Sequence, residues 1–265
     1  MAIEQLAREV KSLAGFINRV KEIKKDWAKR ERSEVTPWFR GQASADWDLR
    51  PRLYRLKSSD EDELRIDFER FGIQMTKRDM HDDWDWYFLM QHYGAPTRLL
   101  DWTDSALLGL YFAVREAGTG TDRKLSPAKK SDAAVWMMEP GSLNKQVIKD
   151  DIILLKESKQ AQPYLPDKLS DKTLRRPHPV AIDPSHVDIR LAVQRSHFTI
   201  HGTVLRGLER VARKRRTRFR LAKIVIASSA IEGIREDLES CGISEMTVFP
   251  DLEGLSRDLV RQWTD

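Results

Sequence analysis

The stretch QHYGAPTRLLDWTDS at residues 91–105 lies between two apolar runs, YFLM at 87–90 and ALLGLYFAV at 106–114. It places histidine, threonine, arginine and aspartate between segments that suit a protein core. A polar group buried without a hydrogen-bond partner costs on the order of 1–3 kcal/mol. We therefore expect these side chains either to form a structural corner with satisfied hydrogen bonds or to line a binding site.

The elements around this stretch alternate between helix and strand. Residues 84–94 have helical spacing, and a glycine and a proline end that pattern. Residues 99–102 have the length and apolar character of a short buried strand. Thr103 or Asp104 is placed to cap the helix that follows at 105–116, which is apolar on every face and is expected deep in the core.

The remaining segments combine both kinds of element. Helical spacing is present at 2–32, 61–76, 229–241 and 251–263, and strand-like patterns are present at 38–41, 133–139, 191–194, 197–200, 223–228 and 246–250. Five prolines in 157–186 indicate a long irregular segment. We expect an α+β fold in which 1–33 form an N-terminal helical region and 34–265 form the main domain.

The composition suits a protein with a substantial apolar core, since 40% of the 265 residues are hydrophobic and 33% are charged. No apolar run approaches the roughly 20 residues that span a bilayer, so no membrane is expected as a partner. MAIEQLAREV at 1–10 lacks the apolar stretch of a signal peptide. Cys241 is the only cysteine, which excludes an internal disulfide. Together these features favour a cytoplasmic location.

The excess of positive charge is concentrated in one segment. RGLERVARKRRTRFR at 206–220 has eight cations and one acid, a net charge of +7 against +5 for the whole chain. A cluster of this kind is typical of a surface that binds a polyanion. The candidate contacts to nucleic acid, either RNA or single-stranded DNA, are Arg213, Lys214, Arg215, Arg216, Arg218 and Arg220. The alternative is a solvated helix face or a docking site for an acidic protein.

The N-terminal segment 2–32 is amphipathic, with apolar residues at three- and four-residue steps and lysine, arginine and glutamate between them. One interpretation is a helix that packs on the main body. The other is a seam for a partner protein, because spacing this near a heptad also suits coiled-coil pairing.

Two segments contain side chains suited to a nucleotide. In WFRGQ at 38–42, Arg40 follows two aromatic residues and precedes a glycine. Its planar guanidinium matches a phosphate or a ribose diol. Gln194 and Phe198 lie on strand-like pieces, where Gln194 would present a carboxamide inward. Taken singly, Arg40 and Gln194 are more typical of a structural ion pair and a structural hydrogen bond than of a binding site.

Two other motifs do not predict a site. GTG at 118–120 lacks the third glycine and the flanking strand and helix of a dinucleotide fingerprint. HDDWD at 81–85 contains metal-ligand residue types, but consecutive residues on a helix point in different directions. No metal site is expected.

Five segments together resemble the FRG domain, a family named for an aromatic-Arg-Gly motif. They are WFRGQ, LRPRLYR, QHYGAPTRLLDWTDSALLGLYFA, RLAVQRSHFTIHG and MTVFPDLEGL, and they extend over about residues 38–255. The family is common in bacteria and associated with phage defence. The resemblance implies an antiviral toxin that an antitoxin or another partner restrains, with 2–32 as a candidate contact.

The order of these segments also resembles that of ADP-ribosyltransferases of the Arg–Ser–Glu type, which implies a split β-sheet core. Arg40 and Gly41 match the first motif, 101–103 take the place of the second, and Gln194 takes the place of the third. The first departure is the carboxamide of Gln194, which stands where that pattern has a carboxylate. The second is a hydroxyl motif reduced to Thr103.

The resemblance implies NAD as the substrate. Arg40, Thr103 and Gln194 would be catalytic: Arg40 would bind the ribose or diphosphate, Thr103 would hold the ribose, and Gln194 would bind its 2′-hydroxyl or the incoming nucleophile. Further contacts to NAD are implied for Gly41, Gln42, His92, Tyr93, Asp101 and Phe198. Asp101 or another acid is the candidate for the missing negative charge.

Three functions are compatible with these residues. The first is an NAD-dependent ADP-ribosyltransferase that modifies nucleic acid in preference to protein. The second is a non-catalytic nucleic-acid-binding or sensor module with a nucleotide in the same cleft. The third is a metal-independent nuclease that uses His92 and Arg40.

Overall fold

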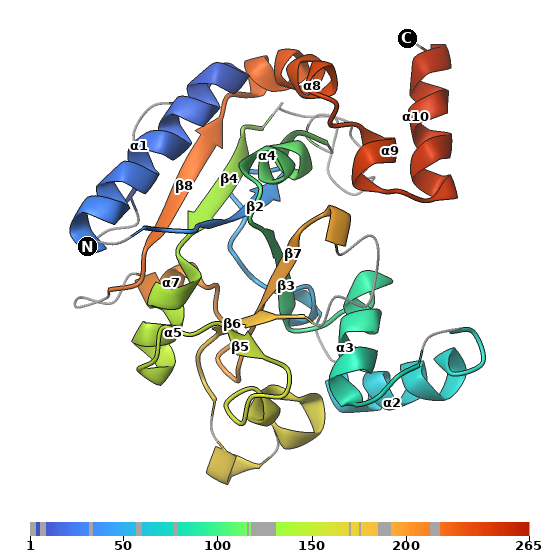
Figure 1. The fold of residues 1–265 in the computed structure, drawn as a ribbon. Coiled ribbons are helices and arrows are strands. Elements are labelled where there is room, and N and C mark those ends of the chain that lie inside the picture. The colour runs from blue at the N-terminus through green and yellow to red at the C-terminus, as the bar shows by residue number, and fades with distance from the viewer. Residues whose placement is uncertain are drawn as a thin grey trace.

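The computed structural model describes residues 4–5, 9–31, 34–56, 60–76, 79–115, 117, 131–169, 171–174, 176–184, 192–212 and 218–264. Its strands form one mixed eight-stranded sheet of order β1-β8-β4-β2-β3-β7-β6-β5 (Figure 1). The strands are β1 (Glu4–Gln5), β2 (Trp38–Gln42), β3 (Leu99–Thr103), β4 (Ala133–Met138), β5 (Leu154–Leu155), β6 (Val180–Asp183), β7 (Ser196–Ile200) and β8 (Leu221–Ile226).

Helices cover both faces of this sheet, which confirms the expected α+β class. The α-helices are α1 (Leu13–Glu31), α2 (Glu61–Gly72), α3 (Asp83–His92), α4 (Ala106–Arg115), α5 (Pro140–Ile148), α7 (Glu209–Ala212), α8 (Ile231–Ser240), α9 (Glu245–Val248) and α10 (Leu252–Thr264). Short 3-10 turns are η1 (Leu53–Arg55), η2 (Gln162–Tyr164), η3 (Pro166–Lys168), η4 (Lys172–Leu174) and η5 (Ser228–Ala230).

The sheet has two halves that meet at a single residue pair. β2 and β3 share one pair of Cα partners, Phe39 and Thr103, whereas β3 and β7 share five and β2 and β4 also share five. Continuing the β2–β3 register would place Gly41 opposite Asp101, but the strands have separated there. Main-chain groups along this split therefore lack a strand partner and need other hydrogen-bond partners.

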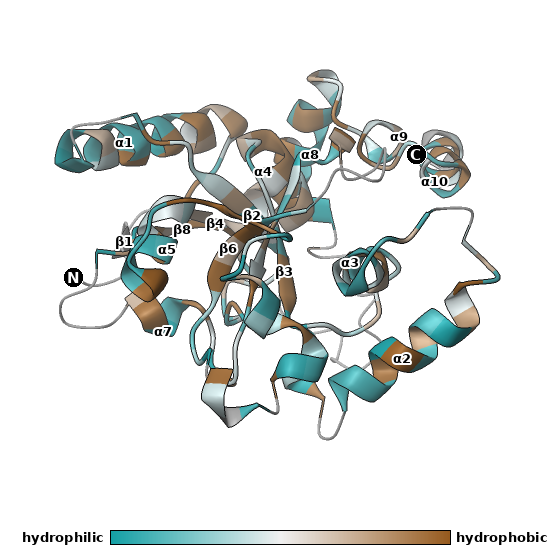
Figure 2. Ribbon diagram, turned by 60° about the horizontal axis from the view of Figure 1, so that its bottom comes forward, coloured by the Kyte–Doolittle hydropathy of each residue, from teal (hydrophilic) through white to brown (hydrophobic). Residues whose placement is uncertain are grey.

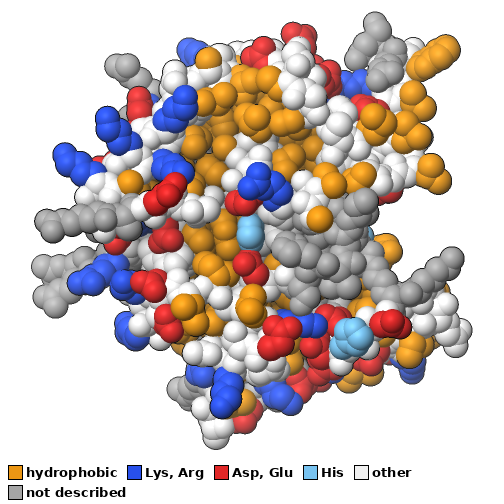
Figure 3. All heavy atoms as spheres, in the orientation of Figure 1, with side chains coloured by type: hydrophobic (Ala, Val, Ile, Leu, Met, Phe, Trp, Pro, Cys, Tyr) orange, Lys and Arg blue, Asp and Glu red, His pale blue; other side chains and the backbone are white. Residues whose placement is uncertain are grey.

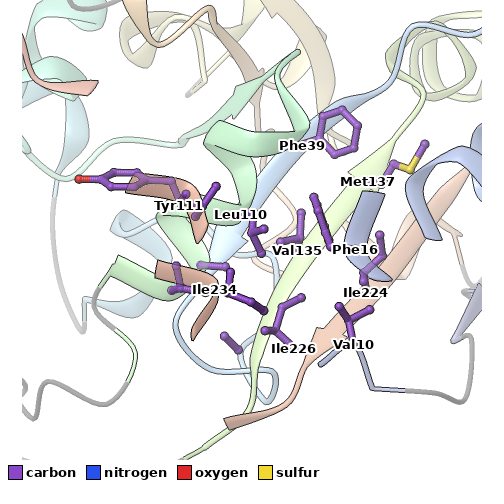
Figure 4. Close-up of a cluster of buried hydrophobic side chains, with 14 of the residues drawn as sticks. Val10, Phe16, Phe39, Leu110, Tyr111, Val135, Met137, Ile224, Ile226 and Ile234 are labelled. Atoms are coloured by element: carbon purple, nitrogen blue, oxygen red, sulfur yellow. The ribbon is translucent and has the colours of Figure 1, made fainter. Parts of the chain in front are cut away.

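The first half of the sheet, β8-β4-β2, packs against α1, α4 and α8. Figure 4 shows this cluster, in which Phe39, Val135 and Ile224 face Phe16 of α1 and Leu110 of α4. Alternate residues of the same strands face the other side, as the period of a strand requires, and pack under α5 and α7. In Figure 1, α1 lies along β8. The apolar face of α1 is thus part of the main core.

The second half of the sheet, β3-β7-β6, packs against α3. Trp84, Tyr87 and Phe88 of α3 form a cluster with Phe198 and Ile200 of β7. In Figure 2 the central strands are largely hydrophobic, whereas the outer helices α1 and α2 mix hydrophilic and hydrophobic residues. Two helices, α3 and α4, therefore cover different halves of the sheet on either side of the split.

Several boundaries differ from the sequence-based prediction. The helix expected over 2–32 begins at Leu13, and residues 4–5 pair in parallel with β8. The strand expected over 246–250 is helix α9, which Ser244 and Thr247 begin with a capping box. Ser105, rather than Thr103 or Asp104, accepts from the Leu108 N–H in the first turn of α4.

Two further segments were also assigned differently. The strand expected over 191–194 is absent from its described part, where 192–193 are helical and 194–195 form a turn. β6 lies within the segment that was expected to be irregular, and its apolar VAI run is fully buried between β5 and β7.

The C-terminal helix α10 leaves an apolar face exposed. Leu252 is 84% exposed and Trp263 is 87% exposed, while α10 packs against α9. Figure 3 shows hydrophobic side chains projecting at the upper right, where α10 lies in Figure 1. Among the described residues, no helix is both long and apolar enough to cross a membrane.

Candidate functional site

A cavity of about 690 Å³ opens above the split, between the C-terminal end of α3 and helix α4. We call it the split-sheet cleft. Its volume lies within the range of roughly 300–1,000 Å³ that is usual for small-molecule sites. Its lining residues are Phe39, Arg40, Gly41, Arg50, Arg52, Arg55, Leu56, Gln91, His92, Gly94, Ala95, Leu99, Leu100, Asp101, Trp102, Thr103, Phe112, Arg115, Gln194, Ser196, Phe198 and Phe249.

Arg40 bridges the split in the sheet. Its Nη1 donates to the main-chain carbonyl of Asp101 at 2.7 Å and lies 3.5 Å from that residue's carboxylate. Burial lowers the pKa of the guanidinium, Asp101 raises it, and the charge of Arg55 lowers it further. Within the described part of the chain, Asp101 is the only partner of this guanidinium. The other nitrogens, Nε and Nη2, have no protein acceptor there.

Gly41 sets the distance between β2 and α4. A Cβ at this position would overlap the backbone of Ala113 and Gly109, so no other residue fits. Gly109 is equally close-packed, because its own Cβ would lie 2.7 Å from the Cβ of Phe39. Gly41 was expected to contact NAD; it lines the cleft, and its closest neighbour is α4. Its role is to fix Arg40 beside the helix that begins after Thr103.

Asp101 is held in the cleft by a chain of side-chain hydrogen bonds. Gln91 Nε2 donates to both carboxylate oxygens of Asp101, at 2.8 and 3.0 Å, and Gln91 Oε1 accepts from the Thr97 hydroxyl. The carboxylate remains 55% exposed. Among the described residues that line the cleft, Asp101 is the one carboxylate.

The arginine of the PTRLL segment has a structural role. Arg98 is 2% exposed and pairs with buried Glu61, while its other nitrogens donate to the carbonyls of His201 and Tyr164. Glu61 also accepts from the Tyr87 hydroxyl, and its negative charge raises the pKa of that hydroxyl beyond the rise that burial causes. The stretch 91–105 is therefore both a satisfied corner, at Arg98, and part of the cleft, at Asp101.

Thr103 and Gln194 reach the cleft from neighbouring segments. Thr103 is buried at the end of β3, where its Oγ1 accepts from the Ser105 N–H at 3.1 Å. Gln194 lies in the turn before β7, and its Nε2 donates to the Val248 carbonyl at 3.2 Å. Arg40, Thr103 and Gln194 thus line one cavity, as their sequence order implied.

The residues expected to contact NAD divide into two groups. His92, Asp101 and Phe198 line the cleft together with Gly41. Gln42 does not line it, because its amide is buried between the Trp136 indole N–H and the Asp48 carbonyl. Tyr93 also lies outside the lining and is 68% exposed. Gln42 lies on the same face of β2 as Arg40, so its hydrogen bonds to Trp136 and Asp48, and not the alternation of the strand, keep it from the cavity.

The cleft also contains cations that were not expected from the sequence. Arg50, Arg52 and Arg55, from the LRPRLYR segment, line one side of it. Arg115 lines it too, but pairs with Glu245, which lies outside the lining. The pKa of Glu245 is below its usual value. Burial alone would raise this pKa, but the hydrogen bonds from Arg115 and Tyr111 outweigh burial.

The candidate nucleic-acid contacts lie largely outside the described residues, since 213–216 are among those that the structure does not describe. Arg218 is exposed. Arg220 is half-buried and forms an ion pair with Glu31 at the end of α1. Among the described residues, no group of three His, Cys, Asp or Glu side chains is placed to hold a metal ion.

The fold and site define an α+β protein with a cationic cleft over a split sheet. The model of one family, the FRG domain, matches residues 36–121. This confirms the resemblance for that part of the chain, which contains β2, α3, β3 and α4 and therefore Arg40, Asp101 and Thr103. Residues 36–121 of the chain thus match the FRG domain, and Gln194 lies outside the match. Comparisons with curated proteins and with solved structures found no match.

Proposed function

We propose that the protein is an NAD-dependent ADP-ribosyltransferase and that the split-sheet cleft is its active site. The observation that carries the proposal is the convergence of Arg40, Thr103 and Gln194 on one cavity of about 690 Å³. These residues come from strands and turns far apart in the sequence, in the order that the transferase resemblance implied. The division of the sheet at the Phe39–Thr103 pair supports the same assignment.

The proposed reaction transfers ADP-ribose from NAD to an acceptor. The bond between ribose C1′ and the nicotinamide nitrogen breaks, and its electron pair leaves with neutral nicotinamide. Positive charge develops on C1′ and the ring oxygen, as it does in glycoside hydrolysis. A nucleophile of the acceptor then bonds to C1′ and releases its proton.

Asp101 is the residue best placed to stabilise the developing charge. Asp101 lines the cleft, its carboxylate is fixed by Gln91, and its side chain is more than half exposed. A pre-oriented carboxylate stabilises a cation without reorganising during the reaction. Asp101 would thereby supply the charge that the Gln194 carboxamide lacks, and it would also accept the proton that the nucleophile loses.

Arg40 has a different part in this proposal. Nη1 is committed to the Asp101 carbonyl and Nε is buried, so Nη2 remains for a ribose or phosphate oxygen. The pairing with Asp101 fixes the guanidinium plane before the substrate binds, which reduces the entropy lost on binding. Thr103, whose Oγ1 accepts from Ser105, still has its hydroxyl proton to donate to the substrate.

The proposed acceptor is nucleic acid, because the segment 206–220 concentrates the positive charge of the chain. Phosphate contacts give affinity that is independent of sequence and falls with salt. We further propose that the protein acts as a toxin in a bacterial cytoplasm, restrained by a partner. The exposed apolar face of α10 offers a surface for that partner, whereas the apolar face of α1 packs into the main core.

A second candidate is a module that binds a nucleotide without turning it over. Gln194 favours it, since a carboxamide whose Nε2 already donates to Val248 contributes no charge. Both candidates predict NAD binding, and they differ only in whether nicotinamide is released.

Incubation with labelled NAD tests the proposal. Total RNA, DNA and protein are offered separately, and label in each fraction is measured together with free nicotinamide. Label in RNA or DNA supports transfer to nucleic acid, and nicotinamide without an adduct indicates hydrolysis. NAD binding without either product would leave the non-catalytic module, and RNA shortened in the absence of NAD would favour a nuclease.

A further inference from the structure

The LRPRLYR segment is built to present arginines to the cleft. Leu49, Pro51 and Leu53 are buried, so the residues between them face outward. Two main-chain hydrogen bonds anchor the buried side: the Leu53 N–H donates to the Thr97 carbonyl at 3.3 Å, and the Leu49 carbonyl accepts from Leu208 at 3.0 Å. The alternation fixes which side chains reach the cavity.

Three cations result: Arg50 and Arg52 alternate with the buried residues, and Arg55 ends the 3-10 turn η1 that follows. Arg50, Arg52 and Arg55 all line the split-sheet cleft. None of them forms an ion pair with a described carboxylate. Arg40 and Arg115 differ in this respect, because Asp101 and Glu245 compensate their charges. The three arginines therefore account for an excess of three positive charges on one side of the cleft.

Two of these arginines are held in place by main-chain acceptors. Arg52 Nη1 donates to the Gly94 carbonyl at 2.8 Å, and Arg55 Nη2 donates to the Arg50 carbonyl at 3.4 Å. Gly94 has a φ of 75° and ends α3, so Arg52 connects the arginine segment to the start of the 94–103 stretch. The side chains are thus oriented by neutral partners that leave their charges uncompensated.

The charge of Arg55 also acts on Arg40, at the other side of the cleft. It lowers the pKa of the Arg40 guanidinium, whereas Asp101 raises it. Like charges gathered in one cavity repel, and the arrangement is stabilised when an anion of matching charge binds between them. Guanidinium groups bind phosphate through pairs of parallel hydrogen bonds, which makes phosphate the anion best matched to this cluster.

We propose that Arg50, Arg52 and Arg55 form a subsite for the diphosphate of a nucleoside diphosphate or dinucleotide. The subsite deepens the proposed function, on which its assignment to NAD rests. It orients the ligand: the diphosphate lies against the arginine segment, and the reacting ribose lies toward Asp101 and Thr103. Arg50 and Arg55 carry the recognition, and Arg52 keeps the segment against the end of α3.

Direct binding of ADP and adenosine to the full chain tests this subsite without any reaction. Calorimetry at low salt should show that ADP binds at least about 10-fold more tightly than adenosine, since the two differ only in the diphosphate. Arg50→Gln with Arg55→Gln should weaken ADP by about 10- to 100-fold and leave adenosine unchanged. Arg70→Gln, on the exposed side of α2 outside the cleft, is the matched control and should bind ADP as the wild type does.

A second measurement needs no variant. Inorganic pyrophosphate should compete with ADP for the wild-type protein. The affinity for both ligands should fall as the salt concentration is raised. Equal affinity for ADP and adenosine, no measurable ADP binding, or a double variant that binds ADP normally would each overturn the subsite. If ADP binding depends on Arg50 and Arg55 but NAD releases no nicotinamide, the subsite stands and the transferase proposal fails. If the wild type consumes NAD and the double variant consumes it with the wild-type KM, the transferase proposal stands and the subsite fails.

Discussion

The guanidinium of Arg40 and the carboxylate of Asp101 are joined across the gap in the sheet, with 2.7 Å from Nη1 to the Asp101 carbonyl and 3.5 Å from Nη1 to the carboxylate. One contact replaces the hydrogen bond that a neighbouring strand would provide, and the other pairs Arg40 with the one carboxylate among the described residues of the lining. The same two residues thus complete the sheet and form the centre of the proposed site. Variants must separate these two roles.

Arg40→Lys keeps a positive charge but loses the planar fork. We expect kcat/KM for NAD to fall by about 100-fold or more, since a lysine cannot reach the Asp101 carbonyl and a substrate oxygen in the same geometry. Thermal unfolding should change less than the rate, because lysine keeps a positive charge beside Asp101. Nicotinamide release measures the rate. A folded Arg40→Lys protein with wild-type kcat/KM would contradict the assignment.

Asp101→Asn separates charge from shape. The amide keeps the size of the side chain but removes the negative charge, so kcat should fall by about 100-fold or more while the dissociation constant for NAD changes less than tenfold. The Gln91 contact has to reorient, since Gln91 Nε2 donates to both carboxylate oxygens. Gln91→Ala serves as the comparison: it should lower kcat less, by loosening Asp101. Loss of binding with unchanged kcat would assign Asp101 to ground-state binding alone.

Gly41→Ala tests the contact between β2 and α4. The added Cβ would overlap the backbone of Ala113 and Gly109, so the free energy of unfolding should fall by about 2–4 kcal/mol. Gly233→Ala is the matched control, because a Cβ there meets no atom within 4 Å and Gly233 lies in helix α8. That substitution should stabilise by up to about 1 kcal/mol. Denaturant unfolding measures both. Equal effects would show that α4 is not packed on Gly41 as described.

His201 makes stability depend on pH. Burial, with the charges of Arg98 and Arg40, lowers its pKa from 6.5 to about 3. Between those values the unfolded chain binds a proton that the folded chain does not, so stability is present above pH 6.5 and is lost as pH falls toward 3. The slope of the unfolding free energy against pH measures how many more protons the unfolded chain binds than the folded chain. His201→Gln should lower that number by up to one across this window. An identical slope in the variant would mean that His201 is protonated in the folded protein.

The elements around the central stretch were predictable because their signals are local. Apolar runs of strand and helix length, ended by glycine and proline, defined α3, β3 and α4. The strand at residues 4–5 was not predictable. The apolar spacing of this segment fits a helix, and the strand forms only by pairing with β8, more than 200 residues away. For 246–250, the β-branched and aromatic residues suggested a strand, but the Ser244–Thr247 capping box begins a helix there.

The candidate site was predictable in part. The order of motifs placed Arg40, Thr103 and Gln194 together, but it did not show that the Gln42 amide is held by hydrogen bonds with Trp136 and Asp48. The arginines of LRPRLYR were also missed as ligands. Their signal was present in the sequence: they alternate with apolar residues, and no acid lies among them.

The most direct test of the central claim is the crystal structure of the protein with a non-hydrolysable NAD analogue. The account predicts the analogue in the split-sheet cleft, with its nicotinamide-side ribose within hydrogen-bond distance of Arg40 or Thr103 and its C1′ beside the Asp101 carboxylate. An analogue that binds on another surface, or that leaves those three side chains without a contact while the cleft stays open, would contradict it.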